Sequence, residues 1–293
     1  MRRLITRRDF MRESSVVALG AMIGCSKGEG VSASKTRVVL VRYKNVWEGD
    51  ALNPAIVQQM LDEAVMALLG YDDPVRAFQL LAKPGDIVGV KSNAWRFLPT
   101  PRELENAIEK RLLDAGVKKE NISIDDRGVR YNPVFQNATA LINVRPLRTH
   151  HWSGIGGCLK NYIIFMPRPS DYHGDSCADL AAFWQSPVGL REKTRLNILS
   201  VLNPQFHGRG PHHFDTRYVW KYHGILVSQD PVAVDAVGLE IINAKRLEYF
   251  GRERALPTSP KHIMMADQRH RLGTSDLAKI ELVKLGWKDG ILI

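Results

Sequence analysis

The chain has 293 residues, of which 44% are hydrophobic and 25% are charged, and its formal net charge is +10. This composition is typical of globular proteins and excludes an intrinsically disordered chain. Three cysteines exclude a disulfide-rich scaffold, and no apolar run reaches the ~18 residues of a membrane-spanning helix. The positive charges are scattered and accompany no recognition motif, so we expect no nucleic-acid partner.

The first residues predict a targeting signal rather than a folded element. Residues 1–24 combine a basic start, a short apolar stretch and small residues, as export signals do. The pair Arg7-Arg8 before Phe10 resembles a twin-arginine signal, which implies export of the folded protein by the twin-arginine translocase. We therefore expect a periplasmic or otherwise exported protein.

Two interpretations of the end of this signal are open. Residues 22–25 resemble a lipoprotein cleavage box, in which Cys25 would be lipidated and would attach the chain to a membrane. Alternatively, the chain is cut near Ala33 and is soluble in the periplasm. Residues 25–35 are rich in Gly and Ser and predict a flexible tether, followed by a single domain at 36–293.

Strand and helix patterns alternate along this domain. Short β-branched and apolar runs predict strands at 37–43, 86–91, 122–125, 140–144, 196–202 and 224–228. Helical spacing predicts helices at 54–70, 101–115, 231–242, 260–270 and 276–286, and Asn53 and Asp230 are the expected N-caps of two of them.

This alternation predicts an α/β fold with a mostly parallel central sheet and helices on both faces. Residues 146–195 break the alternation and are rich in Gly, Pro, His and Trp. We expect them to form a Gly/His-rich insertion of loops and short helices over the strand ends.

Polar residues gather where three predicted strands end. Lys91 and Asn93 follow one strand, residues 125–127 follow another, and residues 145–151 follow a third. Because ligands of parallel α/β sheets bind beyond the carboxyl ends of strands, we expect Lys91, Asn93 and His150 to share one pocket. We expect Lys160 and Asn161 to line the same pocket. The alternative is that strand-to-helix loops are polar in any such fold.

A Gly-rich segment, Gly-Ile-Gly-Gly-Cys-Leu-Lys-Asn at 154–161, offers a second candidate. Gly156 and Gly157 would let backbone N–H groups approach an anion or cofactor, with Lys160 supplying charge and Asn161 a further contact. The segment has neither a Walker A ending nor dinucleotide-binding spacing, and tight packing explains its glycines equally well.

Six of the nine histidines fall within residues 150–213. We expect His150, His173 and His207 as candidate ligands of a divalent metal, although no spacing places two ligands on one helix face. Asp235 lies in an otherwise apolar helix and needs a cation or hydrogen-bond donors, so it belongs either to a salt bridge or to the cofactor site.

Several motifs together resemble the family named domain of unknown function 362. They lie at 88–93, 99–101, 141–144, 148–150 (Arg-Thr-His, where the family commonly has Lys-Thr-His), 157–161 and 228–235. The resemblance spans about 86–240. Many members carry ferredoxin-type Cys clusters, but this chain has too few cysteines for an iron–sulfur cluster. A looser similarity, to nickel-pincer lactate racemases, is analogy alone.

These patterns favour an exported enzyme acting on a small anionic molecule. Lys91 and Lys160 would bind or polarise the anion and His150 would transfer a proton, with a divalent metal or a cofactor loaded before export. An anion or Asp235 would offset the two lysines. The alternative is a non-catalytic periplasmic anion-binding lipoprotein.

The two remaining cysteines leave a further choice open. In an oxidising compartment Cys158 and Cys177 would form either a disulfide or a pair of buried thiols.

Overall fold

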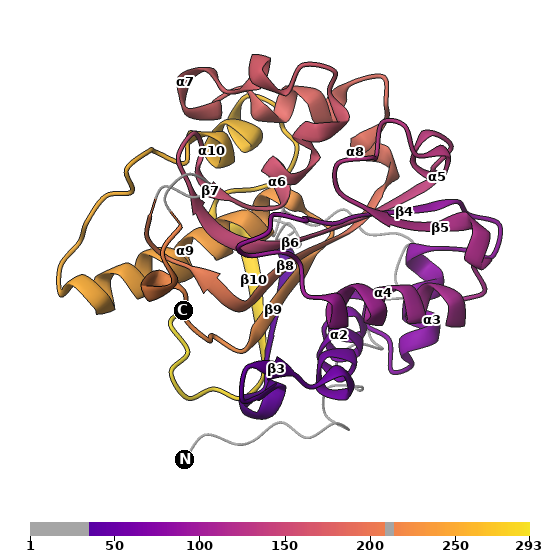
Figure 1. Cartoon of the computed structure of the whole chain (residues 1–293), viewed down its shortest axis with the longest axis horizontal. Coiled ribbons are helices and arrows are strands. Elements are labelled where there is room, and N and C mark those ends of the chain that lie inside the picture. Colours follow the sequence, from indigo (N-terminus) through magenta and orange to yellow (C-terminus); the bar gives the residue numbers. More distant parts are fainter. Residues whose placement is uncertain (1–34, 209–213) are drawn as a thin grey trace, which may run out of the picture. The chain divides into compact units, whose positions relative to one another are not determined.

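A mixed sheet runs through the computed structural model, which describes residues 35–208 and 214–293 (Figure 1). The strands are β1 (Thr36–Arg42), β4 (Val88–Lys91), β5 (Ile122–Asp125), β6 (Ala140–His150), β7 (Gly154–Gly156), β8 (Thr194–Gln205), β9 (Gly224–Ser228) and β10 (Ile280–Gly286). Their order is β10-β1-β9-β8-β6-β4-β5, and β7 pairs with β6. The short strands β2 (Trp47–Glu48) and β3 (Ala51–Leu52) form a separate hairpin.

Most pairings in the large sheet are parallel. β6 runs parallel to β8 and β4, β4 to β5, and β1 to β10, whereas β9 is antiparallel to both of its neighbours. The predicted α/β class with a mostly parallel sheet is confirmed. Because β4, β5 and β6 are mutually parallel, their carboxyl ends lie at one edge of the sheet.

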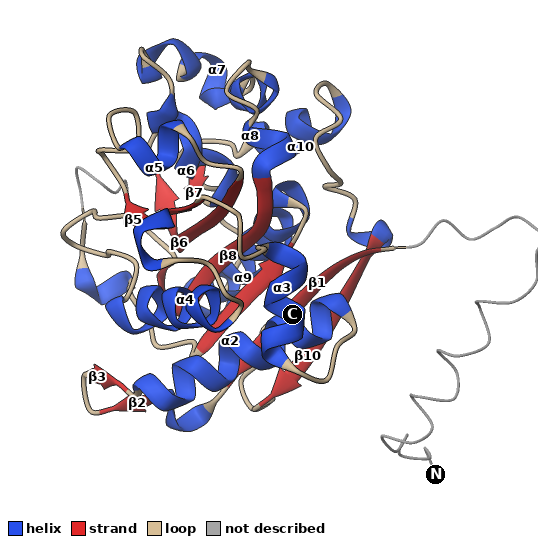
Figure 2. Ribbon diagram, turned by 90° about the vertical axis from the view of Figure 1, so that its right-hand side faces the viewer, coloured by secondary structure: helices blue, strands red, loops and turns tan. Residues whose placement is uncertain are grey.

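Helices cover both faces of the sheet (Figures 1 and 2). The α-helices are α2 (Pro54–Leu69), α3 (Pro74–Leu81), α4 (Arg102–Asp114), α5 (Pro133–Gln136), α6 (Cys158–Asn161), α7 (Gly174–Cys177), α8 (Leu190–Lys193), α9 (Pro231–Phe250) and α10 (Lys261–Gln268). The 3₁₀ helices are η1 (Lys44–Val46), η2 (Lys119–Asn121), η3 (Tyr162–Phe165), η4 (Pro169–Tyr172), η5 (Leu180–Gln185), η6 (Thr216–Tyr218) and η7 (Leu277–Lys279). One buried cluster joins α2, α3 and α4 to the sheet, and a second joins α6, α9 and α10 to it.

Local sequence signals explain where the two long helices begin and end. The Asn53 side chain accepts hydrogen bonds from the first N–H groups of α2, and Gly70 ends that helix in the left-handed conformation. The Asp230 side chain accepts from the N–H groups of Val232 and Ala233 at the start of α9. Both predicted N-caps are confirmed.

Strand β6 is longer than the sequence predicts because it continues through Pro146 to His150. Proline cannot donate to a strand ladder, and the pairing of β6 with β8 shifts register between Pro146 and Arg148. Such a bulge changes the face to which the following side chains point. It therefore affects which residues reach the end of the strand.

Two other predictions from the sequence need correction. Residues 276–286 do not form one helix: the 3₁₀ helix η7 covers only Leu277–Lys279, and β10 then pairs with β1 over seven residues at the edge of the sheet. Backbone pairing with a neighbouring strand outweighs the local apolar spacing there. Helix α3 was not predicted, although its N-cap Asp73 and Pro74 are typical start signals. The helix predicted at 231–242 extends to Phe250.

Residues 151–193 contain β7, short helices and loops, while 146–150 belong to β6 and 194–195 to β8, so the segment predicted as a Gly/His-rich insertion is partly strand. The signal at 1–24, Cys25 and nearly all of the predicted tether lie outside the described residues. From Lys35 onward the chain clusters as one compact unit. Among the described helices, none is long and apolar enough to cross a membrane.

Candidate functional site

A pocket of about 240 Å³ lies at the carboxyl ends of β4, β5 and β6. Five predicted site residues line it: Asn93, His150, Lys160, Asn161 and His173. The rest of the lining comprises Asp126, Arg127, Arg145, Arg148, Trp152, Ile163, Ile164 and Pro169. The convergence of strand ends expected from the sequence therefore forms a real cavity.

The wall of the pocket carries an excess of positive charge. Arg145, Arg148 and Lys160 are all at least 95% buried. Nε and Nη1 of Arg148 and Nε of Arg145 have no hydrogen-bond partner among the described residues. Burial and the repulsion between the two guanidinium groups lower the pKa of Arg148 well below its ordinary value. An anion in the pocket would accept these hydrogen bonds and offset the charge.

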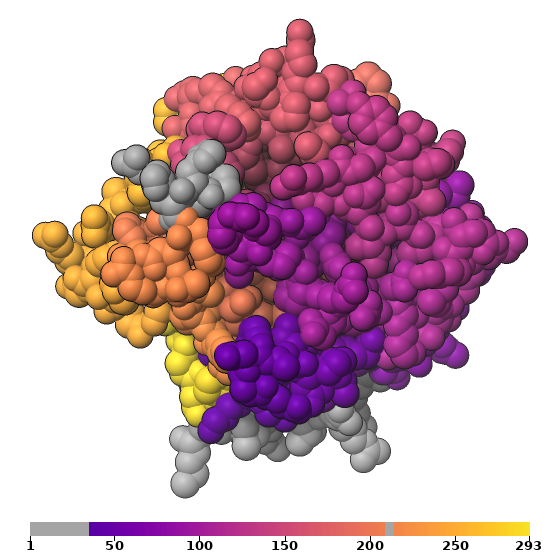
Figure 3. Space-filling model, viewed as in Figure 1, coloured from indigo at the N-terminus to yellow at the C-terminus, as the bar shows by residue number. Residues whose placement is uncertain are grey.

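An aromatic residue covers the outer arginine. The Trp95 ring lies 4.3 Å from the guanidinium carbon of Arg148. Trp95 also contacts Phe214 edge to face, with ring centroids 5.4 Å apart. Figure 3 shows the loop after β4, in purple, beside the segment that follows residue 213, in orange. Such covering limits access of water to the arginine and strengthens its attraction for an anion.

Lys91 lies behind the pocket and is not part of its lining. Its side chain is fully buried, and Nζ donates to Asp126 Oδ1 at 2.5 Å, to the Ser92 carbonyl at 2.6 Å and to Asn161 Oδ1 at 3.4 Å. Burial lowers the pKa of Lys91 to about 8, against the attraction of Asp126. The group that offsets Lys91 is thus Asp126, whereas the sequence suggested an anion or Asp235.

Three asparagines form a chain of hydrogen bonds that starts at Lys91, the last residue of β4, and continues through β6 to β8. Asn161 Nδ2 donates to the Lys91 carbonyl at 3.0 Å and to Asn143 Oδ1 at 2.9 Å, and Asn143 Nδ2 donates to Asn197 Oδ1 at 3.0 Å. All three side chains are buried. Asn143 and Asn197 are not among the predicted site residues, although a polar residue within an apolar strand is the signal that reveals such a network.

Asp235 and the glycines of the Gly-rich segment fix the start of α6. The Asp235 carboxylate accepts the N–H groups of Cys158 at 2.6 Å and Leu159 at 2.9 Å, and burial raises its pKa to about 7. A Cβ on Gly157 would stand 2.2 Å from Asp235 Oδ1, and one on Gly156 would stand 3.0 Å from Arg145 Nη2. These predicted cofactor-binding residues lie outside the pocket lining and hold in place the turn that presents Lys160.

His150 is the last residue of β6 and is 8% exposed. Its Nδ1 accepts the backbone N–H of Trp152 at 3.2 Å, so the ring proton of the neutral form is on Nε2. Burial and the neighbouring cations Arg148 and Lys160 lower the pKa of His150 well below its ordinary value. The ring is therefore neutral at pH 7 and suits hydrogen-bond donation better than proton abstraction.

The three histidines predicted as metal ligands are not brought together. His173 lines the pocket with His150 and stacks on Trp152, with ring centroids 3.9 Å apart. His207 instead lies 3.0 Å from Arg246 Nη1 through its Nδ1. No group of three or more His, Cys, Asp or Glu residues suited to a metal ion occurs within residues 35–208 and 214–293. His212 and His213 lie outside the described residues.

The cysteines in the folded part of the chain are two separate buried thiols, Cys158 and Cys177. Burial raises the pKa of both, so both thiols are neutral at pH 7. Of the two alternatives left open by the sequence, the structure therefore shows the pair of buried thiols and not the disulfide.

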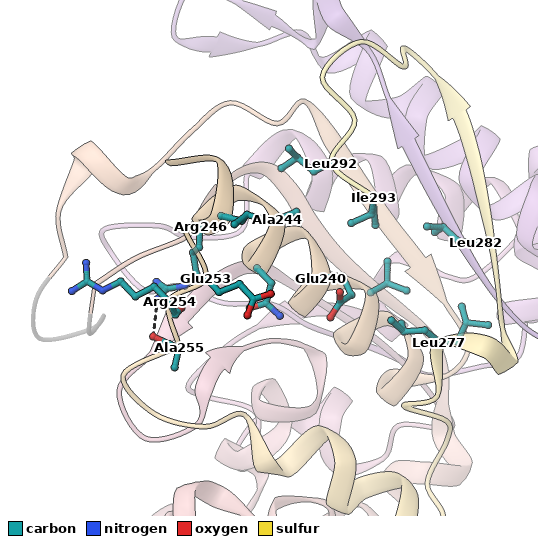
Figure 4. A pocket seen from close by; sticks show the side chains of 14 residues that line it. Glu240, Ala244, Arg246, Glu253, Arg254, Ala255, Leu277, Leu282, Leu292 and Ile293 are labelled. Carbon is teal, nitrogen blue, oxygen red and sulfur yellow. Dashed lines mark hydrogen bonds between the residues drawn. The ribbon is translucent and has the colours of Figure 1, made fainter. Parts of the chain in front are cut away.

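A larger cavity of about 870 Å³ lies between α9, β10 and the C-terminal residues (Figure 4). Its lining combines apolar side chains with Glu240, Glu253, Arg246 and Arg254. Arg246 donates to the carbonyl oxygens of Arg254 and Ala255 at 2.8 Å each. The charges in this lining balance, so the cavity lacks the electrostatic preference for an anion that the strand-end pocket has.

Part of the chain matches a known protein family. The model of the family described as "Domain of unknown function (DUF362)" matches residues 112–240. The matched segment includes Arg145, Arg148, His150, Lys160 and Asp235, and it begins after Lys91 and Asn93. Searches of curated proteins and of solved structures found no match.

Proposed function

We propose that the pocket at the ends of β4, β5 and β6 binds a small anionic molecule and that the protein acts on it as an enzyme. The observation that supports binding is the buried guanidinium group of Arg148. Its Nε and Nη1 donate a hydrogen bond to no described residue, and it lines the same pocket as Arg145 and Lys160. Leaving such donors unpaired is unfavourable, so the arrangement favours a ligand with matching acceptors.

The same pocket contains groups suited to chemistry. Lys160 lies in its wall, and burial lowers the pKa of Lys160 to about 8, helped by Arg145 and Arg148. His150 presents a neutral ring with its proton on Nε2. A cation and a neutral hydrogen-bond donor beside an anion are the parts needed to polarise a bond and to stabilise negative charge that develops on the bound molecule. The alternative, an anion-binding lipoprotein, would use the same arginines without turnover.

Replacing Arg148 by methionine is expected to weaken anion binding about tenfold or more, because a charge-assisted hydrogen bond contributes roughly 1.5–3 kcal/mol. The melting temperature should stay equal or rise, because the change removes a buried guanidinium whose Nε and Nη1 have no hydrogen-bond partner among the described residues. Calorimetric titration with phosphate, sulfate and malonate measures the affinity, and a thermal melt measures the stability.

Arg217→Met is the matched control for this measurement. It removes the same charge from an exposed ion pair with Asp215, so the affinity for the three anions should stay within about a factor of two. Equal affinities of the wild-type protein and Arg148→Met would refute the proposed site.

We also propose that the chain is a member of the matched family and that residues 1–24 export it through the twin-arginine translocase. The family match supports membership of the family. The pair Arg7-Arg8, followed by a weakly apolar stretch, supports export. Lipidation of Cys25 would then hold the exported domain at a membrane surface.

The double variant Arg7→Lys/Arg8→Lys should remain in the cytoplasm, because the translocase recognises the paired guanidinium groups and lysine lacks them. Cell fractionation followed by immunoblotting measures this. Arg2→Lys/Arg3→Lys makes the same kind of change outside the motif and should be exported normally. Periplasmic delivery of the first variant would refute the export proposal. For the wild-type protein, recovery in the membrane fraction supports lipidation of Cys25, and recovery in the soluble periplasm supports cleavage near Ala33.

A further inference from the structure

The Lys160 amine is placed unlike the other buried lysine of the site. Its side chain is 4% exposed and belongs to the pocket wall, and no carboxylate of the described chain lies within ion-pair distance of it. The nearby groups are Trp152, whose ring centroid is 6.0 Å from Nζ, the two arginines, and the neutral thiol of Cys177. A buried amine beside other cations is held partly unprotonated and is nucleophilic.

Lys91 shows the contrasting arrangement within the same molecule. Its ammonium is bonded to Asp126, Ser92 and Asn161 and is excluded from the pocket. Its three hydrogen bonds engage the nitrogen and favour the charged form. Lys91 is therefore a structural cation, whereas Lys160 is available to a bound molecule.

The remainder of the pocket defines what such a molecule must look like. Nε and Nη1 of Arg148 and Nε of Arg145 have no hydrogen-bond partner in the described chain. Guanidinium donors of this kind match the two oxygens of a carboxylate. Ile163 and Ile164 add a small apolar surface. The volume of about 240 Å³ equals roughly eight water molecules at about 30 Å³ each, which suits a compact organic acid.

We infer that Lys160 forms a Schiff base with a small 2-oxo acid whose carboxylate is bound by Arg148 and Arg145. This inference rests on the proposed function, because it assigns the class of anion and the chemical step to the same pocket. It makes Lys160 a catalytic residue and Arg148 a binding residue.

The step is balanced without an oxidant or reductant. The lone pair of Lys160 Nζ attacks the ketone carbon, and the C=O electron pair moves to oxygen, which takes up a proton. Nitrogen gives up its two protons as the C=N bond forms. The oxygen takes up a second proton as the C–O bond breaks, and it leaves as water. His150 is neutral and keeps its Nε2 proton, because losing it would leave an imidazolate. Its N–H lies on the pocket wall and would hydrogen-bond to this oxygen as negative charge develops there, while the protons come from the amine through solvent. The imine so formed withdraws electrons from the adjacent carbons.

Borohydride trapping tests the inference on the full-length protein. Pyruvate is the probe, and sodium borohydride reduces an imine to a stable secondary amine that peptide mass spectrometry locates. We expect one predominant adduct, on the peptide that contains Lys160, with Lys91 unlabelled. Acetone, which has the ketone but no carboxylate, should label Lys160 about tenfold less or weaker still. Predominant labelling of exposed lysines, or equal labelling by acetone, would overturn the inference.

Variants separate this inference from the proposed function. Lys160→Met and Lys160→Arg should abolish the adduct on that peptide, and circular dichroism checks that each is folded. Arg148→Met should reduce trapping by pyruvate about tenfold, and by a larger factor than it reduces the weak labelling by acetone, which has no carboxylate for Arg148 to bind. If malonate binds in calorimetry and pyruvate is not trapped, the Schiff base is wrong and the anion site stands. If neither malonate nor pyruvate binds, both proposals fail.

Discussion

Replacing Asp126 by asparagine is expected to destabilise the fold by about 3 kcal/mol at pH 6, because it removes the one carboxylate bonded to a fully buried lysine. Lys91 Nζ lies 2.5 Å from Asp126 Oδ1, and the variant leaves that ammonium with neutral oxygen partners only. Urea unfolding followed by circular dichroism gives the difference in the free energy of unfolding.

The effect should depend on pH in a defined direction. The pKa of Lys91 is about 8 in the fold, below its ordinary value of 10.5, so the unfolded chain binds this proton more tightly. Its contribution to wild-type stability therefore rises with pH between about 8 and about 10.5. Without Asp126 the folded pKa is lower still, and the rise begins at lower pH. The gap between the two proteins is thus widest at pH 6 and smaller at pH 9.

An exposed ion pair supplies the control. Glu281→Gln removes the partner of Arg37 at the surface, where such a pair contributes about 0–1 kcal/mol. We expect a small effect with the same size at pH 6 and pH 9. If Asp126→Asn does not lower the free energy of unfolding, or lowers it equally at pH 6 and pH 9, the role assigned to the Lys91–Asp126 pair is wrong.

Replacing Gly157 by alanine is expected to destabilise the fold by about 1–3 kcal/mol through overpacking. The added Cβ would stand 2.2 Å from Asp235 Oδ1, and that carboxylate is fixed by the N–H groups of Cys158 and Leu159. The backbone of Gly157 has φ −121°, which any residue adopts, so the clash alone produces the effect. Relief of the clash would displace α6 and with it Lys160, so anion binding should weaken as well.

A double-mutant cycle with Asp235→Ala tests this cause. Once the Asp235 carboxylate is absent, Gly157→Ala should lower the free energy of unfolding by a smaller amount than it does in the wild-type protein. The expected coupling free energy is about 1 kcal/mol or more. Gly85→Ala is the matched control, because a Cβ there meets no atom within 4 Å, and its effect should stay within about 0.5 kcal/mol. Additive effects in the cycle would show that Gly157 and Asp235 act independently.

The sequence predicted those features of the site that local rules control. A continuous apolar run ending in Lys91 predicts a strand end at that point, and parallel pairing places this end beside Asn143 of β6, which continues beyond it to His150. Asn93, His150 and Lys160 line one pocket for that reason. The pairing of Lys91 with Asp126 depends on the packing between β4 and the loop after β5, so the two lysines could not be distinguished from the sequence.

The arginines show a second limit. Arg145 and Arg148 are an odd number of positions apart, and a regular strand would direct them to opposite faces. The register shift after Pro146 brings both to the pocket. His207 is the opposite case, because it belongs to the same His-rich stretch of sequence and lies against Arg246 of α9, outside the pocket.

The sequence by itself determined the α/β class, six strands of the sheet and the caps of α2 and α9, because periodicity and capping act between residues close along the chain. Only the tertiary structure decided that β10 is an edge strand and that Asp126 neutralises Lys91. It also decided that Nε and Nη1 of Arg148 have no hydrogen-bond partner among the described residues. These outcomes depend on burial and on contacts between distant segments, and burial sets whether a charged side chain is a structural partner or a binding group.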